Sequence, residues 1–115
     1  MPAQTQAFAL VGAELATLFP GKSLAEPEVQ WWTDKCPGSE RSAVILGSSC
    51  YSGLYYRAGA IDVAWRGKFG ESAYTHELMH YFLDQHFGDS DPQHQRTSAW
   101  AVVNHADEHL QRAGM

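Results

Sequence analysis

The sequence predicts a single α+β domain over residues 1–115, with a helix near the N-terminus, a small sheet of three or four strands, and two further helices. Apolar residues recur at helical spacing near both ends of the chain. The middle third consists of short runs of β-branched and aromatic residues, separated by turn residues. A chain of 115 residues, 44% of them hydrophobic, can build one core but has no room for a second domain.

The first helix is predicted over residues 6–19, because its apolar side chains follow helical spacing and Pro20-Gly21 follows as a stop. The strands are predicted from runs rich in valine, isoleucine, tyrosine and tryptophan, with glycine- and serine-rich turns between them. These runs cover residues 29–34, 42–47, 52–57 and 60–65.

The clearest helix is predicted over residues 71–87, where Glu71 or Ser72 can cap the N-terminus and Gly88 is a natural left-handed stop. A last helix is predicted over residues 97–112, because its apolar residues form one stripe. The stripe consists of Trp100, Val103, Ala106 and Leu110.

The overall charge and the two cysteines limit the partners and the compartment. With a net charge of -5 and scattered basic residues, the chain is not expected to bind nucleic acid, and no apolar run is long enough to span a membrane. We expect a monomer. Cys36 and Cys50 lie beside turn residues and are expected to form a disulfide, with two unrelated buried thiols as the alternative. A disulfide would favour a secreted or periplasmic location, which the sequence otherwise leaves open.

The segment His76-Glu77-Leu78-Met79-His80 predicts a metal site. Positions i and i+4 of a helix share a face, so both imidazoles can reach one zinc ion. Glu77 is rotated by about 100° from His76, which places its carboxylate beside the ion as a base for an activated water. An apolar face is predicted on the other side of this helix, so the two histidines and Glu77 are expected to point away from the core. That face consists of Tyr74, Leu78, Tyr81 and Phe82.

A catalytic zinc normally has three protein ligands, and three residues are candidates for the third. His94 is preferred, because the turn from Gly88 to Pro92 can fold it back toward the helix. His86 points about 80° away from His76 in an unbroken helix. Glu108 on the last helix is the remaining candidate.

Residues 76–94, HELMHYFLDQHFGDSDPQH, resemble small bacterial metallopeptidases in which a GDxDxxH-like segment follows the active-site helix. The resemblance implies a zincin-like fold with zinc on His76, His80 and His94, and with Glu77 as general base and acid. Two related patterns fit less well. Leu83 stands where the metzincin pattern HExxHxxGxxH has glycine, and the helix around Glu108 lacks the NExxxD pattern of the gluzincins.

The expected function is therefore a zinc-dependent peptidase acting on a peptide or protein substrate. By resemblance to zincins, the strand at 60–65 is expected to bind the substrate along its edge, with a central core strand as the alternative. A second hypothesis is a non-catalytic module that zinc stabilises. Several other polar residues are candidates for orienting an imidazole or binding an oxyanion, with capping or surface packing as their alternatives: Asp84, Asp89, Asp91, Tyr55, Tyr56 and Tyr81.

Overall fold

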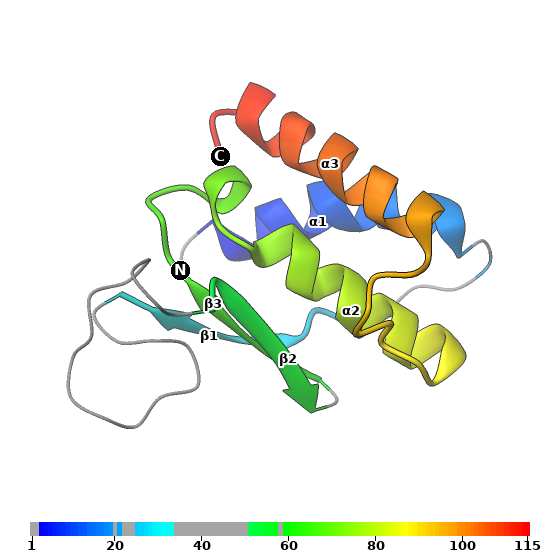
Figure 1. Cartoon of the computed structure of the whole chain (residues 1–115). Helices are drawn as coiled ribbons and strands as arrows, with labels where there is room; N and C mark the ends of the chain where they lie inside the picture. Colours follow the sequence, from blue (N-terminus) through cyan, green and yellow to red (C-terminus); the bar gives the residue numbers. More distant parts are fainter. Residues whose placement is uncertain (1–2, 20, 22–24, 34–50, 58) are drawn as a thin grey trace.

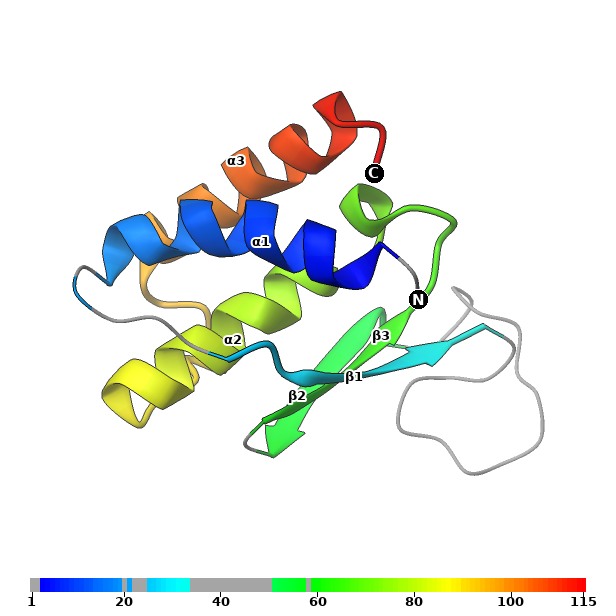
Figure 2. The same cartoon turned by 180° about the vertical axis from the view of Figure 1, so that it is seen from behind.

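The computed structural model describes residues 3–19, 21, 25–33, 51–57 and 59–115. In this part of the chain three α-helices lie on one side of a three-stranded sheet, which confirms the predicted α+β class (Figure 1). Helix α2 (Tyr74–Phe87) packs against the sheet. Helices α1 (Gln4–Leu15) and α3 (Thr97–Arg112) pack against each other on the far side of α2 (Figure 2).

The sheet has the order β1-β3-β2, so the last strand in sequence lies in the middle. Strand β3 (Ala60–Ala64) is parallel to β1 (Glu28–Trp32) and antiparallel to β2 (Gly53–Arg57). All residues from Ile61 to Ala64 are buried. The proposed substrate-side edge strand at 60–65 is therefore wrong, because a strand that is paired on both sides has no free backbone edge. The predicted strand at 42–47, Cys36 and Cys50 lie outside the described residues.

Helix α1 begins two residues before its predicted start, and its C-terminal end tightens into a 3-10 turn, Ala16–Leu18. Helix α3 matches its prediction, 97–112. Helix α2 ends at Gly88 as predicted, with φ 70° and an N–H bond to the carbonyl of Asp84. None of the described helices is long and apolar enough to cross a bilayer.

The N-terminus of α2 differs from its prediction. A separate 3-10 turn, Phe69–Glu71, precedes the helix, and no side chain caps it. The hydroxyl of Ser72 instead donates to the carbonyl of Lys68 and accepts the backbone N–H of Arg66. It thereby closes the turn between β3 and α2, so it is unavailable to the helix.

The apolar face of α2 contributes to the hydrophobic core. Tyr74 and Leu78 are fully buried, and Phe82 is nearly so. They pack in one cluster with side chains of α1, β3 and α3, which fixes the rotation of α2 about its axis. The remaining members of that buried cluster are Ala7, Val11, Leu15, Phe19, Ile61, Val63, Phe69, Met79, Tyr81, Leu83, Ala99, Val103, Ala106 and Leu110.

Candidate metal centre

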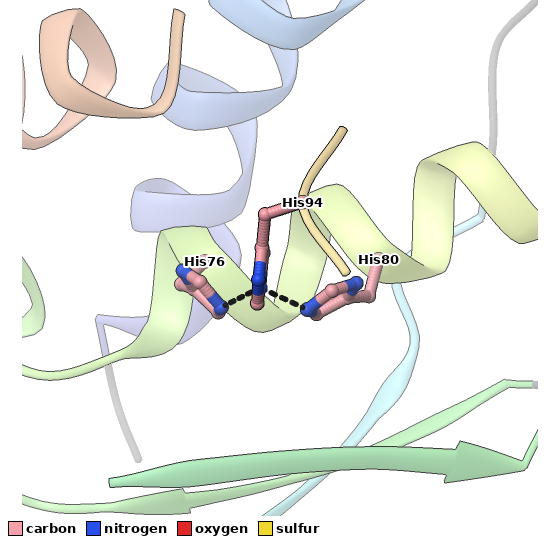
Figure 3. Close-up of side chains that lie close together, drawn as sticks. All are labelled: His76, His80 and His94. Atoms are coloured by element: carbon pink, nitrogen blue, oxygen red, sulfur yellow. Dashed lines mark hydrogen bonds between the residues drawn. The ribbon is translucent and has the colours of Figure 1, made fainter. Parts of the chain in front are cut away.

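The side chains of three histidines lie close together beside α2. His76 and His80 lie one turn apart on the helix, and His94 enters from the connection between α2 and α3 (Figure 3). The Nε2 atom of His94 lies 3.0 Å from Nε2 of His76 and 3.2 Å from Nε2 of His80. Among the residues that the structure describes, this is the only group of three or more side chains suited to hold one metal ion.

The two nitrogen–nitrogen distances from His94 are close to those around one tetrahedral ion, and all three ligand atoms lie within 4.8 Å of one another. Zinc–nitrogen bonds of 2.0–2.1 Å at tetrahedral angles hold two ligand nitrogens about 3.3 Å apart. The three imidazoles therefore form a donor set that fits a divalent cation of borderline softness such as zinc.

The backbone fixes the tautomer of His80. Its Nδ1 atom lies 2.6 Å from the carbonyl oxygen of Ser90. A carbonyl can only accept, so Nδ1 carries the proton and Nε2 presents its lone pair to His76 and His94. Histidines that ligate metals almost always have such a partner on the second nitrogen. This contact could not be predicted from the residue types, because the acceptor is a backbone atom.

The connection between the helices reaches back over α2 through unusual backbone geometry. Asp91 and His94 both have positive φ, 58° and 55°, which is uncommon for residues other than glycine. The N–H of His94 donates to the carbonyl of Asp91, and this closes a tight turn. As a result the imidazole of His94 projects toward α2. Strained residues of this kind gather at functional sites.

Glu77 is buried under the sheet. Only 5% of its surface is exposed, although the sequence predicted that it would point away from the core. Strand β2 crosses it at Gly53, where an added Cβ would lie 2.7 Å from the Cγ atom of Glu77. Burial raises the pKa of Glu77 to about 8. A cation among the imidazoles would lower that pKa again, because an opposite charge favours the carboxylate.

Burial has the opposite effect on the two helix histidines. It lowers the pKa of His76 to about 4, with additional repulsion from His80 and His94. Burial also lowers the pKa of His80, against a smaller opposing effect of the Ser90 carbonyl. Both rings are therefore neutral at physiological pH, as a metal ligand must be.

His76, His80, His94 and Glu77 share a cavity of about 280 Å³. Its other wall comes from β2 and from the loop after α2. The aromatic ring of Tyr51, which is 73% exposed, stands at its rim. The remaining lining residues are Gly53, Leu54, Tyr55, Ser90 and Pro92.

Trp100 covers the histidines and is absent from the lining of this cavity. The centre of an indole ring lies 4.7 Å from that of His76, 4.8 Å from that of His80 and 4.5 Å from that of His94. Trp100 was predicted only as part of the apolar stripe of the last helix, and its contact with the histidines was not predicted. Trp100 thus packs against the three histidine rings without lining the cavity.

The other candidate ligands lie elsewhere. His86 stacks on Phe19 with ring centres 4.3 Å apart. Glu108 is exposed on α3, and its carboxylate lies 4.0 Å from His105. Neither side chain belongs to the histidine group.

The remaining polar candidates have other partners. Asp84 does not orient an imidazole, because it accepts the hydroxyl of Tyr55. The hydroxyl of Tyr81 donates to the carbonyl of Ala25. Asp89 accepts the backbone N–H of Asp91. The side chain of Tyr56 lies outside the described residues.

Comparison with protein families, with characterised proteins and with solved structures finds no match. The site must therefore be interpreted from its own geometry.

Proposed function

We propose that the chain is a zinc-dependent peptidase of a small zincin-like type, with His76, His80 and His94 as ligands and Glu77 as general base and acid. The convergence of three imidazole nitrogens beside a buried glutamate carries this proposal. Three neutral nitrogen ligands and one open position are typical of catalytic zinc, whereas structural zinc sites are closed by four protein ligands.

The residues divide the work of hydrolysis between them. A zinc ion held here would supply Lewis acidity, lowering the pKa of a water to about 7 and polarising the scissile carbonyl. Glu77 would take a proton from the attacking water and give it to the departing amine. Its burial under Gly53 removes competing solvent, and the cavity would give a substrate access to the histidines and Glu77.

A peptide is the favoured substrate because of the strand that borders the site. Gly53, Leu54 and Tyr55 line the cavity, and β2 stands at the end of the described sheet on this side. An extended chain lying along β2 would gain backbone hydrogen bonds and bring its amide bonds past Glu77. This assigns to β2 the role that the sequence suggested for residues 60–65.

One observation favours a second function, that of a module stabilised by zinc without turnover. An ion on these ligands would connect α2 to the segment before α3, and such a crosslink stabilises a small fold. The burial of a carboxyl group at the site has no purpose in that case.

The test compares the wild type with Glu77→Gln, and with Glu108→Gln as a control for loss of an exposed glutamate on α3. Zinc content is measured per chain, and cleavage is followed on a mixture of unfolded proteins. We expect one zinc in each protein and cleavage by the wild type and Glu108→Gln only. Zinc in all three without cleavage would favour the stabilised module, and absence of zinc would refute the site.

A further inference from the structure

Asp91 is a buried acidic residue in the middle of the connection between α2 and α3. Its carboxylate accepts three hydrogen bonds. The backbone N–H of Gln95 donates to Oδ1 at 2.8 Å, while the N–H of Arg96 and the indole N–H of Trp100 donate to Oδ2 at 2.9 and 2.8 Å. Burial alone would raise the pKa of Asp91, but the hydrogen bonds from Arg96, Trp100 and Gln95 lower it to about 2. The group is therefore a carboxylate at any physiological pH.

The main chain of Asp91 is also held. Its N–H is bound by the carboxylate of Asp89, and its carbonyl accepts the N–H of His94. With the bonds from Gln95 and Arg96, the side chain and backbone of one residue hold both ends of the turn that contains His94. Because His94 has a φ of 55°, it needs surrounding contacts to keep this conformation.

The third hydrogen bond to the Asp91 carboxylate comes from the indole N–H of Trp100, which lies in the first turn of α3. A carboxylate at the indole N–H fixes the rotation of the ring as well as its position. In this orientation the ring contacts all three imidazoles, at centre-to-centre distances of 4.5–4.8 Å. The backbone of the His94 turn and the ring packed on the histidines thus depend on the same two oxygen atoms.

We infer that Asp91 is a positioning residue for the histidine site, which holds His94 in reach of α2 and orients Trp100 against the three rings. This inference rests on the proposed metal site. It assigns to Asp91 an effect on metal affinity and ligand geometry although its side chain is bonded to none of the three histidines.

The test uses Co²⁺, whose visible absorption reports the number and arrangement of its ligands, added to the metal-free chain. Asp91→Asn keeps the shape of the side chain but has one acceptor oxygen where three N–H groups need two, and it turns an NH₂ group toward a donor. Asp89→Asn is the matched control, because that residue makes one bond and can keep it with its remaining oxygen. Circular dichroism first establishes that each metal-free variant is folded.

We expect Asp91→Asn to bind Co²⁺ about 10- to 100-fold more weakly than the wild type. Its spectrum at saturating metal should also change, which a loss of fold stability alone would not produce. Asp89→Asn should stay within about threefold of the wild type, consistent with a single retained bond. If Asp91→Asn binds as Asp89→Asn does, with an unchanged spectrum, the inference is overturned. If the wild type binds no Co²⁺, it is the proposed metal site that fails.

Trp100→Phe covers the case in which Asp91→Asn does not fold. It keeps an aromatic ring at this position and removes the bond to Asp91 together with part of the indole. We expect a several-fold loss of Co²⁺ affinity, since the hydrogen bond to the Asp91 carboxylate is lost and only part of its effect acts through the ligands. Affinity and spectrum equal to the wild type in this variant would also overturn the inference.

Discussion

Replacing Glu77 by glutamine in the metal-free protein is expected to raise its stability at neutral pH and to change it little in acid. The carboxyl group is 5% exposed beneath Gly53, and burial raises its pKa from the ordinary 4.5 to about 8. A raised pKa means that the folded state binds its proton more tightly than the unfolded state. The stability that Glu77 contributes is thus complete below pH 4.5 and is lost as the pH rises toward 8.

The size of the effect follows from the two pKa values. Between pH 4.5 and 7 the unfolded chain releases the proton and the folded chain retains it, at 1.36 kcal/mol per pH unit, which amounts to about 3 kcal/mol at pH 7. At pH 5 the same linkage gives less than about 1 kcal/mol. For a domain of this size the difference at pH 7 corresponds to a rise in Tm on the order of 10 °C. Glutamine has nearly the same shape and does not titrate, so it avoids this loss.

The assay is thermal unfolding of metal-free wild type, Glu77→Gln and Glu108→Gln between pH 5 and 8, followed by circular dichroism. The titration of the histidines is common to all three proteins and cancels in the differences. The Tm of Glu77→Gln should separate from that of the wild type as the pH rises, whereas Glu108→Gln should follow the wild type. Parallel curves for all three proteins would show that Glu77 is not held in a desolvated environment, and the burial argument would be refuted.

Three further predictions concern single positions. Gly53→Ala should leave zinc binding intact and lower peptidase activity about 100-fold, because the new Cβ displaces the carboxyl group of Glu77; zinc content and initial rates measure this. The metal-free protein should lose up to about 3 kcal/mol of folding stability as the pH falls from 6.5 to 4, because the lowered pKa of His76 makes the unfolded state bind more protons. Acid unfolding of His76→Asn should lack this loss. Gly12→Ala should raise stability by about 0.5–1 kcal/mol in thermal unfolding, because Gly12 lies in α1 with open space beside it.

The elements with strong local patterns could be predicted from the sequence. The 97–112 helix follows from its apolar stripe, and the end of α2 follows from Gly88. The spacing of His76 and His80 fixed their common face, and the turn after α2 correctly indicated that His94 lies near them.

The features that could not be predicted from the sequence depend on contacts between segments that are distant along the chain. The central place of β3 depends on a parallel pairing with β1, which no local pattern encodes. Glu77 is buried because the backbone of Gly53 lies across it, not because of its neighbours on α2. The cap predicted at Ser72 failed because Arg66 and Lys68 use that hydroxyl.

The residues that would bind the metal and the strand that buries Glu77 come from different parts of the chain. His76, His80 and His94 all lie between positions 76 and 94, so bringing them together requires closing only a short loop, at small entropic cost. The cover over Glu77 comes from β2, which belongs to a different part of the sequence. If the chain cleaves peptides as proposed, a molecule whose sheet has not yet docked can hold zinc while its base remains in water. Such a molecule would cleave neighbouring chains poorly, and full activity would appear only once the sheet packs over Glu77.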